Sequence, residues 1–487
     1  MASNHLIQAK SMMSDLNKQS TKLMIGTMFT GCEVFYFTLH LLVALLNQNF
    51  GVNVETSLEW TVDNVRWKRD YVNARSPPKF SFGDAIELSQ NEWRGTDHIS
   101  NEPAVLYPVH ICAIGFECDT VSKLSQVEGR EHCIETQSGK TGKTGRATLL
   151  CITKFRFPLS LLENSAILGK ENIRFITDYL NFFGIIVYAF TLCAKQCRSG
   201  VARERQYMLV VPLQETPLDQ NAEGYKMPDW VMEFAAALQS LQVGVGDPNS
   251  VLMDRDDPHY VMWHQMAVQE HAVMEMKELE KKAVAQAKKK AKTEESVWRV
   301  DHLEEFRDAG LQWPPCLETD RDLDRAVAHL PRRMQEVAWY FCHNPKYQLD
   351  VPTYHDLNPS ITLKSCSRIN VMTLVCNSVV WDRQRKRVLW GAENMMLQGL
   401  PLDIIMDPAY TISNAQMTEM AGNMFNAFAI GTILASVIAT VPLASIDQAP
   451  DGDLSEYGDD SDGCFEGAET DEGGEEDSDC ESDLAGE

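Results

Sequence analysis

The chain has 487 residues, a formal net charge of −25 and 44% hydrophobic residues. This length allows two or three domains, and the hydrophobic share supports a sizeable core, which excludes a mostly disordered protein. The charge is uneven, because residues 441–487 contain 18 Asp and Glu and no Lys or Arg. The rest of the chain is only mildly acidic, so a local basic groove for a polyanion is not excluded.

The 13 cysteines form neither a CxxC pair nor a Cys/His set with zinc spacing. We therefore expect no metal site and a reducing compartment. The first 20 residues lack the order of a secretory signal peptide. Residues 427–443 are uncharged but fall short of the roughly 20 residues that span a bilayer, so we expect a buried core helix there and no membrane partner.

Strand-like and helix-like segments alternate over the first 215 residues. Such alternation predicts βαβ units around a mostly parallel sheet, which binds ligands beyond the carboxyl ends of its strands. We expect strands at residues 23–30, 52–59, 80–88, 104–115, 157–163, 184–192 and 206–213, and helices at residues 34–46 and 170–183.

The stretch SGKTGKTGR, residues 138–146, resembles a phosphate-binding P-loop. The full pattern needs an earlier glycine at position 134, where this chain has Ile134, and a helix after the loop. The following residues, from Thr148 onward, look like a strand. We therefore interpret the stretch as a loop that contacts phosphates, with Lys140 among its cations, or closes over a substrate, or is simply flexible.

Beyond residue 212 the pattern changes. A long helix is predicted over residues 261–293, ending in a lysine-rich run at 281–292 that is either a solvated helix face, a nuclear-import signal or a phosphate contact. Residues 321–388 mix polar loops with short strands, and a helical pattern returns at Gly391. From Asp447 the chain is acidic, rich in Gly and Ser, and predicted to be disordered.

Eight short motifs mark the ends of these segments in order. They are FTGCE at 29–33, LEW at 58–60, GDA at 83–85, GFECDTVS at 115–122, LLENS at 161–165, GVARERQYMLVV at 200–211, GAENMMLQGLP at 391–401 and EMAGNMFNAF at 419–428. Each alone is weak. Their order and spacing, with a large gap after the sixth, are specific.

In this set the chain resembles the C5-cytosine-specific DNA methyltransferases, over about residues 20–445. The resemblance implies an α/β fold: a Rossmann-like S-adenosylmethionine-dependent methyltransferase sheet with a second, mixed target-recognition region. It implies these parts: an N-terminal extension (1–20), the first part of the catalytic domain (21–214), a helical insert and target-recognition region (215–390), the C-terminal return to the catalytic domain (391–446) and the acidic tail (447–487).

The resemblance assigns the catalytic roles. Cys118 corresponds to the nucleophile that adds to carbon 6 of a flipped cytosine, which makes carbon 5 reactive toward a methyl donor. Glu163 corresponds to the glutamate that binds the ring nitrogen and amino group of the base, and Asn164 would hold its turn. Arg203 and Arg205 match the family's Arg-x-Arg element and would contact the base and its backbone.

The implied cofactor is S-adenosyl-L-methionine. Its methionine part would lie against the turn after the first strand, and the far end of the chain would close the same pocket. An acidic residue would bind the ribose, an aromatic residue would stack near the adenine, and a second acidic residue would accept from the adenine amino group. In the order of the chain, the expected contacts are Phe29, Thr30, Gly31, Glu59 (ribose), Trp60 (stacking), Asp84 (adenine amino group) and Asn423.

The sequence departs from the family next to the nucleophile. Glu117 stands where the family has Pro, and Asp119 stands where it usually has Gln. Two carboxylates beside a thiol raise its pKa and slow its attack. Glu33 replaces a second glycine of the first turn. We expect an active, divergent enzyme, with a catalytically inactive DNA-binding relative as the alternative.

The expected substrate is DNA, because the middle region of roughly 180 residues is larger than a tRNA-directed enzyme of this family needs. A tRNA cytosine-5 methyltransferase is the alternative within enzymes, so RNA stays open as a partner. The acidic tail either contacts basic proteins, shields the groove or keeps the protein in solution. The DNA substrate and the lysine run suggest the nucleus, with the cytoplasm as the alternative.

Overall fold

The computed structural model describes residues 21–51, 53–121, 130–212, 229–269, 272–273, 297–347, 351–359, 361, 366–407 and 410–440. Three predictions therefore lie outside the described residues. They concern the N-terminal extension, the lysine-rich run and the acidic tail.

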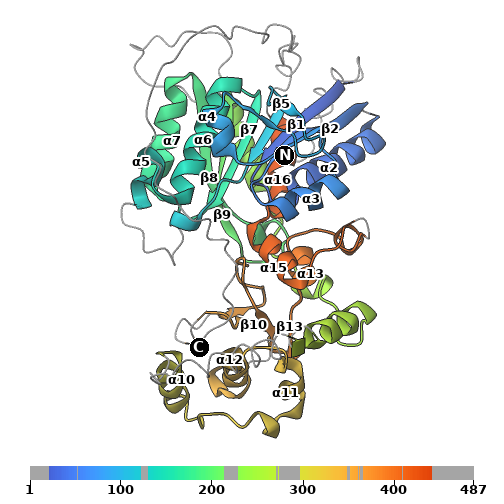
Figure 1. Cartoon of the computed structure of the whole chain (residues 1–487), viewed down its shortest axis with the longest axis vertical. Coiled ribbons are helices and arrows are strands. Elements are labelled where there is room, and N and C mark those ends of the chain that lie inside the picture. The colour runs from blue at the N-terminus through green and yellow to red at the C-terminus, as the bar shows by residue number, and fades with distance from the viewer. Residues whose placement is uncertain are drawn as a thin grey trace.

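A seven-stranded sheet forms the centre of the larger lobe (Figure 1). Its order is β3-β2-β1-β6-β7-β9-β8. The first five of these strands in that order are parallel, and β9 runs antiparallel to both β7 and β8. The bounds are β1 (Thr21–Met28), β2 (Val54–Val62), β3 (Phe80–Phe82), β6 (Ile111–Ile114), β7 (Leu159–Ser165), β8 (Ile185–Cys193) and β9 (Glu204–Pro212). The α/β, Rossmann-like expectation is confirmed.

Two apolar clusters sandwich this sheet, one on each face. The first joins α2 (Val34–Phe50), α3 (Arg66–Arg75), α8 (Asp229–Ser240) and α16 (Ala427–Thr440) to the sheet. The second joins α4 (Ala85–Gln90), α5 (Cys133–Thr136), α6 (Gly139–Phe155) and α7 (Lys170–Phe182) to the opposite face. Burial on both faces explains why the central strands are almost continuously apolar.

Helix α16 has the uncharged sequence that raised the question of a membrane span. The stretch Asn414–Thr440, which holds α15 (Asn414–Asn423) and α16, is long and apolar enough to cross a membrane. Within its most apolar 18-residue window, 61% is buried inside the protein. Residues such as Ile430, Ile433 and Val437 belong to the first apolar cluster, as expected for a core helix.

Three predicted elements differ in the structure. The strand expected at 104–115 is two strands, β5 (Pro103–Val105), which pairs with β4 (Arg94–Thr96), and β6. Pro108 between them cannot donate to a ladder. The expected third strand ends at Phe82, and Asp84 then caps α4. The strand expected from Thr148 is wrong, because this segment lies inside α6, whose buried face carries the apolar residues.

The insert has a core of its own in the lower lobe (Figure 1). It contains three helices that the sequence reading did not predict, α10 (Val297–Asp308), α11 (Arg321–Val327) and α12 (Arg332–His343). With them is a four-stranded sheet of β10 (Thr353–Asp356), β11 (Cys366–Arg368), β12 (Val380–Asp382) and β13 (Arg387–Val388). Helices α13 (Gly391–Leu397), α14 (Leu402–Ile405), α15 and α16 lead back to the sheet.

Candidate active site

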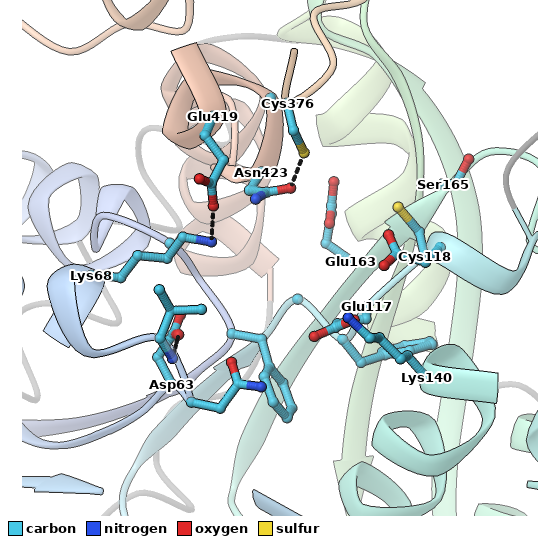
Figure 2. Close-up of a pocket in the computed structure, with 18 of the residues that line it drawn as sticks. Asp63, Lys68, Glu117, Cys118, Lys140, Glu163, Ser165, Cys376, Glu419 and Asn423 are labelled. Atoms are coloured by element: carbon cyan, nitrogen blue, oxygen red, sulfur yellow. Dashed lines mark hydrogen bonds and ion pairs between the residues drawn. The ribbon is translucent and has the colours of Figure 1, made fainter. Parts of the chain in front are cut away.

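A pocket of about 510 Å³ lies beyond the carboxyl ends of β1, β2, β6 and β7. The strand order reverses between β1 and β6, and open α/β sheets bind ligands at such a point. Five acidic and four basic residues line it. Figure 2 labels ten of the lining residues: Asp63, Lys68, Glu117, Cys118, Lys140, Glu163, Ser165, Cys376, Glu419 and Asn423. Phe29, Gly31, Gly115, Asp119, Arg203 and Arg205 also line the pocket.

Cys118 follows β6 and lines the pocket, just before the short helical turn Asp119–Val121. Asn164, at the end of β7, donates from Nδ2 to the Phe116 carbonyl over 2.8 Å. This bond ties the segment before the cysteine to the neighbouring strand. Gly115 allows the tight approach, because a Cβ there would lie 2.6 Å from the Phe425 ring and 2.9 Å from the Phe29 carbonyl oxygen.

Glu163 and Arg205 share the pocket with Cys118. The Nε atom of Arg205 lies 3.0 Å from Oε1 of Glu163, and both side chains are largely buried. The pKa of the Cys118 thiol is raised to about 11, first by burial and then by the charges of Glu163 and Asp119, while Arg205 and Arg203 lower it. Burial, more than the flanking carboxylates, therefore keeps this thiol protonated at neutral pH.

Arg203 lines the pocket, but its guanidinium donates hydrogen bonds to backbone carbonyls. It donates to the carbonyls of Leu374, Gly422 and Met424 at 3.1, 2.9 and 3.1 Å. This corrects the expectation that both arginines face the base, because carbonyls of distant segments occupy the guanidinium of Arg203. Arg203 joins the start of β9 to the insert and to the end of α15.

The turn after β1 carries three of the predicted cofactor contacts. Phe29 and Gly31 line the pocket, and Gly31 has a φ of +77°, which favours glycine. Thr30 is buried behind them and donates to Glu33 over 2.8 Å. Asn423, from the far end of the chain, lines the same pocket and accepts a hydrogen bond from the Cys376 thiol.

Glu59, Trp60 and Asp84 are not among the residues that line this pocket, so the structure does not bring them together with the other predicted contacts there. Glu59 and Trp60 lie inside β2 because the strand runs three residues further than predicted. The Glu59 carboxylate accepts from the Tyr107 hydroxyl over 2.5 Å, and the Trp60 ring is buried against Gly26. Asp84 accepts from the Ile86 amide as the N-cap of α4.

Asp63 is the acidic residue that directly follows β2 and lines the pocket. The sequence reading missed it because it ended the strand too early. Lys68 from α3 and Glu419 from α15 were missed as well. Their Nζ and Oε1 atoms lie 3.0 Å apart, and the Lys68 side chain is 8% exposed. No local signal in the sequence could have suggested this pair, because its two partners lie in helices that are far apart in the chain.

Glu33 lies under the same turn, outside the pocket lining, at the start of α2. Its Oε1 accepts from the hydroxyls of Thr27 and Thr30, at 2.7 and 2.8 Å. Burial raises the pKa of this carboxyl to about 7. The extra side chain is thus accommodated beneath the turn and leaves the pocket open.

Within the described ranges, no group of three or more His, Cys, Asp or Glu side chains is placed to hold a metal ion.

Lys140, in the first turn of α6, reaches the pocket near Glu117 (Figure 2). The segment that resembled a P-loop is therefore a helix start that contributes one cation to this pocket.

Comparisons with known proteins give fold neighbours alone. No family model matches the chain, and no curated protein matches it. The solved structures that match include the Schizosaccharomyces pombe Dnmt2 methyltransferase, with 10% identity, a TM-score of 0.39, and coverage of 85% of this chain and 98% of that one. A Spodoptera frugiperda DNMT2 mutant has 11% identity, a TM-score of 0.40, and coverage of 85% and 99%. The Entamoeba histolytica methyltransferase EhMeth has 7% identity, a TM-score of 0.42, and coverage of 86% and 98%. With scores this low, function has to be inferred from the pocket residues.

The residues present fit S-adenosylmethionine. The pocket volume falls in the range of about 300–1,000 Å³ that small-molecule sites occupy. Gly31 and Gly115 line the pocket and have no side chain, so a ligand can approach their backbone closely. Asp63 follows the second strand, where a carboxylate suits ribose hydroxyls. Phe29, Gly31, Asp63 and Asn423 would hold the cofactor.

Proposed function

We propose that this protein is an S-adenosylmethionine-dependent cytosine-5 methyltransferase that acts on DNA. One observation carries the proposal: Cys118, Glu163 and Arg205 meet in one pocket at the switch point of the sheet. A nucleophile, a carboxyl group and a cation are what addition to a pyrimidine ring requires.

The roles follow from the positions. The Cys118 thiol gives up its proton to solvent as its sulfur adds to carbon 6 of the cytosine, and Glu163 holds the ring nitrogen and amino group while charge develops there. After carbon 5 has taken the methyl group, the proton on carbon 5 leaves to solvent and the carbon–sulfur bond breaks, which restores the ring and the free cysteine. Arg205 keeps the Glu163 carboxylate in place through their ion pair. Asn164 fixes the segment before Cys118. When bound, S-adenosylmethionine supplies the methyl group. The target base has to leave the duplex stack to reach the pocket.

DNA is favoured over tRNA because the insert is large and has its own apolar core. Such a separate lobe suits a duplex that must be held while one base is extracted. The raised pKa of Cys118 supports a second candidate, a binding protein that keeps this pocket without catalysis.

The test uses methyl-labelled S-adenosylmethionine with duplex DNA and, separately, tRNA, followed by base-resolution mapping of modified cytosine. We expect label at carbon 5 of cytosine in DNA, and none from Cys118→Ser. Label in tRNA alone would assign the other substrate. A protein that binds the cofactor and labels neither nucleic acid would be the binding relative.

A further inference from the structure

Lys68 is a buried lysine in the pocket wall. Its side chain is 8% exposed, and its Nζ lies 3.0 Å from Oε1 of Glu419. A buried ammonium is costly unless it is paired. Burial lowers the pKa of Lys68, but Asp63 and Glu419 raise it more, so the net shift is upward. Lys68 is therefore a fixed positive charge at neutral pH.

Two carboxylates accompany this cation. Asp63 follows β2, and Glu419 comes from α15, far away in the sequence. The Glu419 side chain is 38% exposed, so it is open to a ligand. A lysine paired with a partly exposed carboxylate matches a zwitterion, whose carboxylate would pair with Lys68 and whose ammonium would pair with Glu419.

The position in the pocket points to the same ligand part. Figure 2 shows Lys68 and Glu419 on one side of the pocket, and Cys118 with Glu163 on the other. Asn423, four residues after Glu419, lines the pocket between them. The α-amino-acid end of the cofactor carries an anion and a cation, whereas its adenosine end is neutral, so the amino-acid end suits the side with the Lys68–Glu419 pair.

We propose that Lys68 binds the α-carboxylate of the cofactor's methionine part, and that Glu419 binds its α-ammonium group. This inference rests on the proposed function. An ammonium has three N–H donors, so a ligand carboxylate can join Lys68 while Glu419 stays in contact. Five acidic and four basic side chains line the pocket, which favours a cofactor with a net charge of +1 over a neutral one.

The experiment compares two ligands by isothermal titration calorimetry. S-adenosylhomocysteine carries the amino-acid end, and 5′-methylthioadenosine lacks it. We expect Lys68→Met to weaken S-adenosylhomocysteine binding about 10- to 100-fold, because a charge-assisted hydrogen bond is lost. Binding of 5′-methylthioadenosine should change less than about twofold, since it has no carboxylate for Lys68 to hold.

Three further variants sharpen the comparison. Lys68→Arg should restore most of the affinity for S-adenosylhomocysteine, because the charge returns. Glu419→Gln should weaken that ligand selectively, as it removes a partner of the ammonium. Lys22→Met is the matched control, since Lys22 pairs with Glu59 at 3.1 Å outside the pocket. It should leave both affinities unchanged.

The outcomes separate the two proposals. If Lys68→Met weakens both ligands equally, Lys68 only ties α3 to α15, and this inference is wrong while the proposed function stands. If the wild-type protein binds neither ligand, the proposed function is wrong, and this inference falls with it. Thermal unfolding of each variant shows that any affinity change belongs to a folded protein.

Discussion

The Nε atom of Arg205 lies 3.0 Å from Oε1 of Glu163, and the charges of both residues act on the Cys118 thiol in opposite directions. Arg205 lowers the pKa of the thiol and Glu163 raises it. The two residues of this ion pair therefore influence the pKa of the Cys118 thiol, and with it the reactivity of the cysteine, next to where the base would be held.

The first prediction concerns alkylation of Cys118. Because its pKa is about 11, the thiolate fraction, and with it the rate of reaction with iodoacetamide, should rise about tenfold per pH unit from pH 7 to 10. At pH 8.5, Glu163→Gln should speed the reaction and Arg205→Met should slow it, each by several-fold. Mass spectrometry of the Cys118 peptide measures the rate, with the exposed Cys316 as the internal reference. Equal rates in both variants would contradict the assigned electrostatics.

The second prediction concerns Glu33 and stability. The folded protein holds its proton more strongly than the unfolded chain, because the pKa rises from 4.5 to about 7. The contribution of Glu33 to the free energy of unfolding should therefore fall as the pH rises from about 4.5 to 7, by up to ~3 kcal/mol, and stay level above that.

Glu33→Gln removes this titration while keeping an oxygen that Thr27 and Thr30 can donate to. The difference between wild type and variant, from urea denaturation at pH 5 and pH 8, isolates the contribution. The variant should gain stability relative to wild type at pH 8. A difference that does not depend on pH would show that the carboxyl is not buried as described.

The third prediction concerns the anchoring role of Arg203. Arg203→Met leaves the carbonyls of Leu374, Gly422 and Met424 without their donor, so we expect a loss of ~3–5 kcal/mol in unfolding free energy. Hydrogen exchange should also quicken in α15. Arg205→Met is the comparison, and it should cost less because that side chain pairs with one carboxylate. Similar losses in both variants would argue against the anchoring role.

The fourth prediction concerns Gly115. Gly115→Ala places a methyl group 2.9 Å from a backbone oxygen and 2.6 Å from the Phe425 ring, so the segment before Cys118 has to move. We expect a loss of ~2–3 kcal/mol in unfolding free energy and weaker cofactor binding. Gly431→Ala in α16 is the control, because its Cβ would meet only Thr38 at 3.5 Å. Helix propensity should make it neutral or more stable by up to ~1 kcal/mol.

Much of the fold could be predicted from alternating apolar segments, because burial on both sheet faces imposes that pattern. The strand end before Cys118 was found for this reason. Asp63 was missed because the predicted second strand ended three residues too early, which made Glu59 the acidic residue at its end. Local sequence places strand ends poorly, as pairing with neighbours decides where a ladder stops.

The contacts of Arg203 were also beyond sequence reasoning. An Arg-x-Arg element looks like two exposed cations, and only the packing of the insert and α15 shows that one of them holds carbonyls. The Lys68–Glu419 pair has the same origin, because its partners lie in helices that are distant in sequence and adjacent in space.

The reach of Arg203 has a consequence for synthesis. Its partners Gly422 and Met424 leave the ribosome more than two hundred residues after it does. Until then the nascent chain lacks one wall of the pocket, and the guanidinium of Arg203, which is buried in the folded protein, is exposed to water. A messenger RNA truncated before the codons of α15 would therefore yield a protein that has its central strands but not a complete pocket.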